Sequence, residues 1–288
     1  MQEYEGATPD ETVSLHPRFT VDDSAYVGAI PEQYHRGLGP FLFEPFARHT
    51  AEVIKVLGPR RVLETACGTG IVTRRMREVL PDGALLVASD LNEPMLAVAR
   101  NTLGGARHVQ WAQADMCKLQ FADSEFDAVV CQFGLMFAPD RLAAVREARR
   151  VLKRRGALLA TTWGSLEDNP IIYAAHRAIA SVFPEDPPQY LPRAPFGFGD
   201  PEVLMDLLLE GGFGNVVVDV IEKPAIARHA RDVAVGLIEG YPLVDEIRLR
   251  DASRLPVAID AVTDAIARQF GERPVRARIC ALVASGVA

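Results

Sequence analysis

Short apolar runs alternate with amphipathic segments of helical period between residues 61 and 162. The runs have the length and composition of buried strands and cover residues 61–64, 84–90, 108–115, 126–132 and 157–162. Helical segments lie between them at 71–80, 94–99 and 141–152. Strands that alternate with helices at this interval predict a parallel sheet, covered by helices on both faces and joined by right-handed crossovers.

The alternation is interrupted after Trp163. Residues 164–200 are rich in proline around one helical stretch, 171–182. Because proline lacks a backbone donor, such a segment cannot be sheet, and it suits an ordered lid beside the carboxyl ends of the strands. Further helices at 203–209, 230–239 and 256–270 accompany strands at 216–220 and 278–283. The expected fold is therefore α/β: a Rossmann-like, doubly wound, seven-stranded and mostly parallel sheet.

The amino-terminal region is expected to form a separate cap. Residues 1 to about 25 form a loose leader, with Phe19 as a possible anchor, and residues 26–36 form a turn and a short helix. The stretch 41–46 is too apolar for a free linker and should fold over another part of the protein. We expect residues 1–45 to be the leader and helical cap, and residues 46–288 to be one domain with the lid insertion at 164–200.

Composition narrows the class of partner. The chain has 288 residues, 49% of them hydrophobic, and a formal net charge of −7, which argues against nucleic acid as the main partner. The first 23 residues lack the features of a signal peptide, and no apolar run reaches the roughly 20 residues that cross a bilayer. Cys67, Cys117, Cys131 and Cys280 are scattered and form no metal-ligand spacing. We expect a reduced, cytoplasmic protein without a metal or a membrane partner.

The segment 61–70, RVLETACGTG, is the most informative stretch of the chain. A buried strand turns through small residues directly into a helix, and Gly68 and Gly70 allow a sharp turn close to a ligand. The helix start supplies free amide donors. Glu64 ends the strand, and a carboxylate there disfavours a pyrophosphate and favours a ligand with a positive charge.

Three successive strands end in acids, Glu64, Asp90 and Asp115. The carboxyl ends of parallel strands meet at one edge of the sheet, where open α/β sheets bind ligands. Together the acids indicate a ligand with a cationic amino-acid end, a ribose diol and an adenine-like donor. The alternative is that all three merely cap the following helices.

These residues resemble the motifs of class I S-adenosylmethionine-dependent methyltransferases. The glycine-rich motif corresponds to 64–70, and the following motifs correspond in order to SDLN at 89–92, QADM at 113–116 and FDAVV at 126–130. The resemblance covers about residues 60–165 and is nearest to the small-molecule methyltransferases of ubiquinone and menaquinone biosynthesis, which have a segment similar to 131–137. Ala66 replaces the first glycine of many members, which implies that this position needs a small residue more than a positive φ.

The resemblance implies S-adenosylmethionine as cofactor and S-adenosylhomocysteine as product. Asp90 would accept hydrogen bonds from the ribose hydroxyls and Asp115 from the adenine amino group. Glu64 would hold the loop and, through water or directly, favour the methionine ammonium. The implied cofactor-binding residues are Tyr34, Glu64, Ala66, Gly68, Gly70, Asp90, Leu91, Asn92, Met95, Asp115, Met116, Gln132 and Phe133.

The implied reaction is in-line methyl transfer to a small-molecule acceptor, an O, N or C nucleophile of a secondary metabolite or quinone-like compound. We expect the cap and lid to supply the acceptor wall from Phe41, Trp163, Tyr173, Phe196 and Phe198, for each of which core packing is the alternative. If a base is needed, His35 and His176 are the candidates, unless they are simply exposed helix histidines.

Other functions fit the sequence less well. An NAD(P)-dependent oxidoreductase would need a third glycine where Thr73 stands. A non-catalytic S-adenosylmethionine-binding protein would keep the same motifs. Nucleic acid as acceptor would use arginines such as Arg149 and Arg150, but runs of this kind are usually solvated helix faces. A homodimer could form through the leader and the late helices. The identity of the acceptor, and which of its atoms is methylated, cannot be derived from the sequence.

Overall fold

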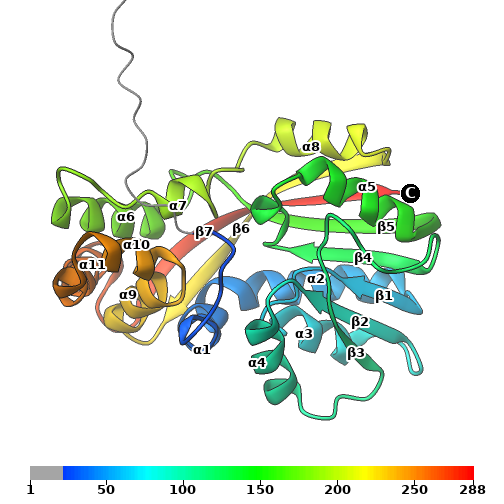
Figure 1. Ribbon diagram of the computed structural model, residues 1–288, viewed down its shortest axis with the longest axis horizontal. Coiled ribbons are helices and arrows are strands. Elements are labelled where there is room, and N and C mark those ends of the chain that lie inside the picture. The colour runs from blue at the N-terminus through cyan, green and yellow to red at the C-terminus, as the bar shows by residue number, and fades with distance from the viewer. Residues whose placement is uncertain (1–21) are drawn as a thin grey trace, which may run out of the picture.

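The computed structural model describes residues 22–288, which form a seven-stranded sheet in the order β3-β2-β1-β4-β5-β7-β6 (Figure 1). The strands are β1 Arg61–Glu64, β2 Leu85–Asp90, β3 Val109–Gln113, β4 Phe126–Gln132, β5 Leu152–Trp163, β6 Gly214–Ala227 and β7 Val275–Val287. The first five strands pair in parallel, and β7 runs antiparallel to both of its neighbours. The predicted α/β fold with a mostly parallel sheet is confirmed, whereas the anchor predicted at Phe19 lies outside the described residues.

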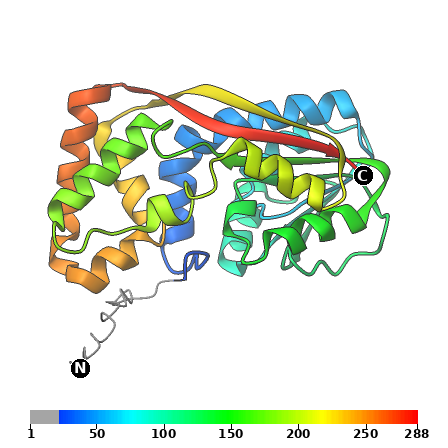
Figure 2. The ribbon, with the colours of Figure 1, turned by 90° about the horizontal axis from the view of Figure 1, so that it is seen from above.

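Helices cover both faces of the sheet. On one face α2 Glu44–Leu57 packs against α3 Ile71–Val79, and on the other α5 Arg141–Val151 packs against α8 Pro201–Glu210 (Figure 2). The helix α4 Glu93–Leu103 follows β2. This arrangement leaves the carboxyl ends of β1, β2 and β4 clear of crossover helices, as doubly wound sheets do.

A second group of helices, the helical lobe, lies at the far end of β6 and β7 (Figure 1). It combines three separate segments of the chain: the cap, the predicted lid and the late helices. Its elements are α1 Ile30–Gln33, the π-helix η1 Tyr34–Phe43, α6 Pro170–Val182, α7 Tyr190–Arg193, α9 Ala230–Glu239, α10 Leu243–Asp251 and α11 Leu255–Phe270. The predicted lid is thus one part of a larger packed unit and does not stand alone.

The cap is one continuous helical stretch where the sequence suggested a turn, a short helix and an apolar connection. The wide turns of η1 accommodate Pro40, which lacks the donor an α-helix needs. Gly37 meets Gly236 of α9 so closely that a Cβ on Gly37 would lie 2.7 Å from the Gly236 Cα. Phe41 and Phe46 are almost completely buried, so the prediction that 41–46 folds over other elements is confirmed.

Strand β6 is nearly three times as long as predicted, and β7 is about twice as long. β7 pairs with β5 only from Ala281 onward, and its earlier residues pair with β6 alone. The pair therefore continues past the sheet as a ribbon, whose Ala225 and Val275 are buried against the helical lobe. Pro224 hid this extension from sequence analysis, although an edge strand tolerates a proline because its outer edge needs no donor.

Two helices of the lobe, α7 and α10, were missed. α7 is a single turn in the proline-rich insert, and α10 carries acidic and basic residues with little apolar periodicity. Packing on several sides, rather than an amphipathic pattern, holds these segments in place. Within residues 22–288, none of the helices is both long and apolar enough to cross a bilayer.

Candidate active site

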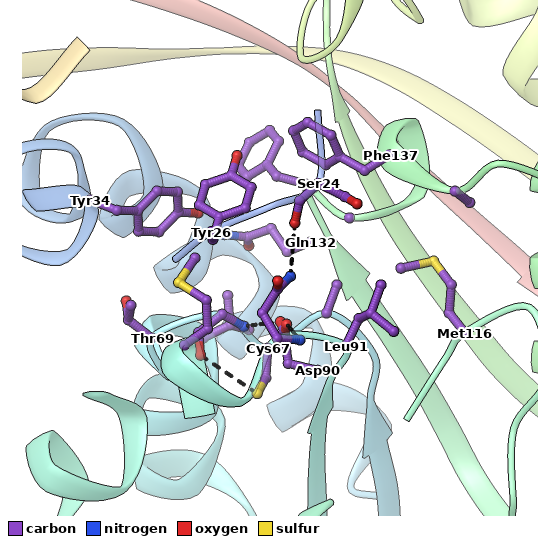
Figure 3. A pocket seen from close by; sticks show the side chains of 18 of the residues that line it. Ser24, Tyr26, Tyr34, Cys67, Thr69, Asp90, Leu91, Met116, Gln132 and Phe137 are labelled. Atoms are coloured by element: carbon purple, nitrogen blue, oxygen red, sulfur yellow. Dashed lines mark hydrogen bonds between the residues drawn. The ribbon is translucent and has the colours of Figure 1, made fainter. Parts of the chain in front are cut away.

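A cavity with about 900 Å³ of empty space, partly open to solvent, lies at the carboxyl ends of β1, β2 and β4. Figure 3 shows its two sides, with Cys67, Asp90 and Leu91 from the sheet edge facing Tyr26, Tyr34 and Phe137. The cavity thus lies between the carboxyl edge of the sheet and the cap, where ligand sites of doubly wound folds occur.

The loop after β1 forms the floor through a series of left-handed residues. Ala66, Gly68 and Gly70 have φ values of 52°, 54° and 78°. Position 66 was expected to need a small residue more than a positive φ, and in the structure it has both. An alanine in this conformation costs about 1–2 kcal/mol, because its Cβ approaches the following carbonyl oxygen. Gly134 accommodates that Cβ, since a Cβ of its own would lie 2.4 Å from the Ala66 Cβ.

Asp90, at the end of β2, lines the cavity and accepts two backbone hydrogen bonds. One carboxylate oxygen accepts from the Gly68 backbone N–H at 2.8 Å, and the other accepts from the Asn92 N–H at 2.8 Å. Burial raises the pKa of Asp90, while these backbone donors oppose the shift. Each oxygen keeps a free lone pair for a ligand in the cavity that Asp90 lines.

Glu64 lies beneath the loop and does not line the cavity. Its carboxylate accepts from the Thr73 Oγ1 at 2.6 Å, which ties β1 to the start of α3. Burial raises its pKa to about 8, so at neutral pH Glu64 is mostly protonated. Gly70 also faces away from the cavity, because a Cβ there would meet Leu103 of α4 at 2.8 Å. Of the predicted cofactor-binding residues, Glu64 and Gly70 are thus the two that do not line the cavity.

Asp115 stands at the exposed rim of the cavity, two residues beyond β3. Its Oδ1 accepts from the Cys117 backbone N–H at 2.8 Å, and the residue forms an isolated bridge with Lys118. Met116 follows it into the lining. The three acids therefore occupy three levels: Glu64 below the loop, Asp90 in the wall and Asp115 at the rim.

The wall opposite Asp90 is aromatic. Tyr34 stacks on Phe43 with ring centroids 4.6 Å apart, and Tyr26 meets Tyr34 edge to face at 5.7 Å. Phe133 and Phe137, which follow β4, complete this side. Burial raises the pKa of the Tyr26 and Tyr34 phenols well above the ordinary 10.0, so both are neutral hydrogen-bonding groups.

Comparisons with known proteins place the chain in a family. Residues 63–160 match the family described as Methyltransferase domain. The ubiquinone/menaquinone biosynthesis C-methyltransferase UbiE of Ectopseudomonas mendocina is 32% identical over 195 residues, which are 63% of this chain and 76% of that protein. The chain belongs to the class I S-adenosylmethionine-dependent methyltransferases. The methyltransferase therefore uses S-adenosylmethionine as its methyl donor and a small molecule as its acceptor, and the predicted alternatives, a binding-only protein and an NAD(P)-dependent oxidoreductase, are not supported.

Two further relatives extend the comparison. The demethylmenaquinone methyltransferase of Staphylococcus epidermidis is 27% identical over 212 residues, covering 69% of this chain and 88% of that protein. The solved phosphoethanolamine N-methyltransferase 2 of Haemonchus contortus, in complex with S-adenosyl-L-methionine, has a TM-score of 0.55 and 19% identity, covering 89% of this chain and 56% of that chain. At this identity the structural likeness concerns the fold alone.

Most of the predicted cofactor residues line the cavity of the methyltransferase. They come from the cap, from the strand ends and from the loops that follow the strands. They are Tyr34, Ala66, Gly68, Asp90, Leu91, Asn92, Met95, Asp115, Met116, Gln132 and Phe133. Gln132 is also fixed in orientation, since its Oε1 accepts from the Thr50 hydroxyl at 2.9 Å.

The predicted acceptor wall needs correction. Of the five aromatic residues expected there, Phe41, Trp163, Phe196 and Phe198 are buried in the core, and Tyr173 lies in a separate groove between α6 and α11. Trp163 stacks behind Phe133, with ring centroids 3.9 Å apart, and therefore supports the wall without forming it. The cap supplies Tyr34 and Phe43 to the cavity as expected, whereas no residue of the predicted lid at 164–200 lines it.

The two histidines proposed as bases lie outside the cavity lining. The His35 Nδ1 is 3.0 Å from the Thr69 Oγ1, and Thr69 stands between the imidazole and the cavity. Burial and then the nearby Arg74 lower the pKa of His35, and burial and then Arg177 lower that of His176. His35 thus connects the cap to the loop after β1, and His176 lies on α6, away from the site.

Sequence reasoning missed about half of the lining. The missed residues are Ser24, Tyr26, Phe43, Cys67, Thr69, Ile71, Val72, Ala114, Gly134, Phe137, Ala138 and Pro139. Cys67 and Thr69 lie within the glycine-rich motif, so their position was available from the sequence, whereas nothing local marks Ser24 or Tyr26. Among residues 22–288, no group of three or more His, Cys, Asp or Glu side chains is placed to hold a metal ion.

Proposed function

We propose that the cavity holds S-adenosylmethionine with its nucleoside at Asp90 and Asp115. The carrying observation is Asp90, a buried carboxylate whose two oxygens are held by backbone donors and still face the cavity. It would accept from both ribose hydroxyls, because paired oxygens match a diol. Asp115 would accept from the adenine amino group, and the Met116 backbone N–H would donate to the ring.

The remaining residues of the cofactor side would shape the pocket by contact. Leu91, Asn92 and Met95 would pack around the ribose and the adenine, and Ala66 and Gly68 leave room for the methionine part. Tyr34, Gln132 and Phe133 would close that end. Glu64 would act indirectly, because it holds the loop through Thr73 and does not itself line the cavity.

The bound cofactor would supply an electrophilic methyl group on its sulfonium. The protein must then hold an acceptor in line with that group and exclude water. Such positioning can supply about 7–11 kcal/mol of the barrier. The buried aromatic wall and the small residues of the loop are suited to this task, which requires shape more than titrating groups.

We further propose that the acceptor is a flat, electron-rich aromatic compound of the phenol or hydroquinone class. The wall that would face it consists of Tyr26, Tyr34, Phe43, Phe133 and Phe137. Within the described chain, no lysine, arginine or histidine lines this cavity, so a strongly anionic acceptor would have no cationic partner. The names of the relatives, enzymes of ubiquinone and menaquinone biosynthesis, support the same class.

Among the described residues, no histidine or lysine lines the cavity to act as a base, which fits such an acceptor. The oxygen and the ring carbons of a phenol or hydroquinone are nucleophilic without help from the protein, because the hydroxyl group donates electron density into the ring. Such a hydroxyl also ionises more readily than that of an aliphatic alcohol. His35 would then be a structural tie, because Thr69 separates it from the cavity.

A panel assay tests the proposal. The methyltransferase is incubated with labelled S-adenosylmethionine and hydroquinones, monophenols, aromatic amines and phosphoethanolamine, and the product atom is located by mass spectrometry and NMR. Hydroquinones or phenols should accept the methyl group at least tenfold faster than the other classes. Preferential labelling of amines or phosphoethanolamine would contradict the proposed acceptor class and leave the cofactor assignment intact.

We also propose a cytoplasmic homodimer that does not act on nucleic acid. The four cysteines are all free, with three of them buried, as expected in a reducing compartment. Arginine clusters that could have bound nucleic acid pair instead with acids: Arg74 and Arg75 with Glu44, and Arg150 with Glu147. Light scattering of the purified protein tests the dimer, and retention on heparin tests nucleic acid binding.

A further inference from the structure

Residues 22–26, here called the strap, cross the cavity beside the proposed nucleoside end. Ser24 and Tyr26 both line the cavity. The Asn92 side-chain amide donates to the Ser24 carbonyl oxygen at 3.0 Å, as the dashed line in Figure 3 shows. Because the Asn92 backbone also donates to Asp90, the strap is linked directly to the acid proposed to bind ribose.

The strap is held from its other side by Arg193, at the end of α7 in the helical lobe. The Arg193 Nε donates to the Asp23 Oδ2 at 2.9 Å and the Nη2 donates to the Asp23 Oδ1 at 2.5 Å. The same Nη2 donates to the Glu246 Oε1 at 2.6 Å. Glu246 is buried and also accepts from the Gln189 backbone N–H. Its contact with Arg193 therefore holds the guanidinium in the orientation that pairs with Asp23.

A second contact joins the same two elements. The hydroxyls of Tyr26 and Tyr190 are 3.1 Å apart, and the Tyr190 hydroxyl donates to the Asp23 carbonyl oxygen at 3.4 Å. Because the Tyr190 hydroxyl donates its one hydrogen bond to the strap backbone, it must accept the hydrogen bond from the Tyr26 hydroxyl. The single-turn helix α7 receives the strap at both Asp23 and Tyr26.

A turn separates the strap from the cap. Val27, Gly28 and Ala29 are all exposed, and Gly28 has φ +62° with no atom near the position of a Cβ. Ile30, the first residue of α1, is buried. Rotation at this exposed turn would allow the strap to move without disturbing the packing of the cap.

We propose that Arg193 is a positioning residue of the methyl-transfer reaction, which keeps the strap closed over the bound cofactor by its grip on Asp23. The inference rests on the assignment of the cavity to S-adenosylmethionine under the proposed function. It extends that assignment, because Arg193 lies in the insert, far in sequence from every cofactor motif. Release of the product nucleoside then requires the ion pair to open, and the rate of release depends on the helical lobe.

The decisive variant is Asp23→Ala, which removes the grip and leaves the Arg193–Glu246 pair intact. Stopped-flow kinetics with S-adenosylhomocysteine should show a dissociation rate about five- to tenfold faster, with little change in the association rate, since a bidentate charged pair is lost. Arg193→Lys keeps the positive charge but loses the two-pronged guanidinium contact with Asp23. It should raise the dissociation rate only about two- to threefold. Asp260→Ala is the matched control, because it removes an acid from the exposed Arg231–Asp260 pair.

The salt dependence of the dissociation rate distinguishes an ion pair that controls release from a residue that only supports the fold. Raising the salt concentration from about 0.05 to 0.5 M should speed dissociation from the wild type and from Asp260→Ala, because the half-exposed Asp23–Arg193 pair is screened, and should have less effect on Asp23→Ala. Equal dissociation rates in Asp23→Ala and Asp260→Ala would overturn the inference. If Asp90→Ala bound S-adenosylhomocysteine as tightly as the wild type, the cavity assignment itself would fail; if only the Asp23 result failed, that assignment would stand.

Discussion

The two sides of the cavity differ in how the chain builds them. On the sheet side, Asp90 ends β2, while Gly68 and Asp115 lie in the short loops after β1 and β3, so strand ends and tight turns set their positions locally. On the facing side, Tyr26, Tyr34 and Phe137 come from distant segments that meet only through packing. The sheet side is polar and held by backbone donors, whereas the facing side is aromatic and neutral. The difference indicates that the half proposed to hold the cofactor depends on backbone geometry, and the half proposed to hold the acceptor depends on side-chain packing.

The buried Glu64 carboxyl, below the loop on the sheet side, should make the stability of the protein depend on pH. Its folded pKa of about 8 exceeds the ordinary 4.5, so the folded protein keeps a proton that the unfolded chain releases. Its contribution to stability is therefore present below about pH 4.5 and is lost as the pH rises to about 8, at up to about 1.4 kcal/mol per pH unit. Glu64→Gln should remove this loss and raise the free energy of unfolding most at pH 8.

Urea unfolding between pH 5 and 8.5 measures that effect. Glu52→Gln, which changes an exposed acid on α2, is the control and should follow the wild type. Affinity for S-adenosylhomocysteine should change little in Glu64→Gln. A large loss of affinity would show that Glu64 contacts the cofactor after all.

Gly134 tests whether the loop after β1 tolerates any additional atom. In Gly134→Ala the new Cβ would meet the Ala66 Cβ at 2.4 Å and the Cys131 Sγ at 3.1 Å. We expect a loss of about 1–3 kcal/mol in the free energy of unfolding, as for other overpacked sites. The double variant Ala66→Gly/Gly134→Ala should recover most of it, and Gly105→Ala, where the Cβ meets open space, should lose little. An unchanged melting temperature in Gly134→Ala would contradict this packing.

Asp90 tests the chemistry of the sheet side. Asp90→Ala should weaken S-adenosylhomocysteine binding about ten- to a hundredfold in calorimetry, since charged hydrogen bonds to the ribose are lost. Asp82→Ala, in the exposed turn before β2, removes an acid of the same type outside the cavity. A dissociation constant equal to that of Asp82→Ala would disprove the ribose assignment.

His35 tests whether the facing side needs a base. A general base contributes about 10²- to 10⁴-fold to a rate. Because Thr69 lies between His35 and the cavity, His35→Ala should slow turnover of the best acceptor less than about tenfold, and the pH profile should keep its shape. A loss above a hundredfold that excess imidazole restores would reassign His35 as the base.

Trp163 gives the smallest expected effect. Its indole N–H is buried without a hydrogen-bond partner among the described residues. Trp163→Phe loses apolar contact but also removes that unpaired donor, so the two effects on stability should cancel to within about 1 kcal/mol. Affinity for the acceptor, measured as KM, should change less than about twofold; a rise above tenfold would place Trp163 in the acceptor wall as first expected.

Sequence analysis succeeded where a residue's environment follows from its neighbours in the chain. The acids Asp90 and Asp115 were found because parallel strands end at one edge. The positive φ of Ala66 was ranked below its small size, because the sequence does not show that Gly134, just beyond the end of β4, leaves room for the Cβ of a left-handed alanine.

Other features depended on contacts that no local pattern reports. Trp163 and Tyr34 are both large aromatic residues in segments expected near the site, and nothing in the sequence distinguishes their positions. In the structure Trp163 lies behind the cavity wall, whereas Tyr34 is part of it. The extension of β6 past Pro224 was hidden for a similar reason, because it depends on pairing with β7 alone beyond the sheet.

The sequence by itself determined the α/β fold, the order of its motifs and the two acids, Asp90 and Asp115, that line the cavity. Periodicity, turn residues and strand ends act over a few positions, so they can be derived without coordinates. Only the tertiary structure decided which aromatic groups line the cavity, that Glu64 lies under the loop, and that Arg193 pairs with Asp23. Those outcomes depend on segments far apart in the chain, and the direction of a side chain there is set by what packs against it.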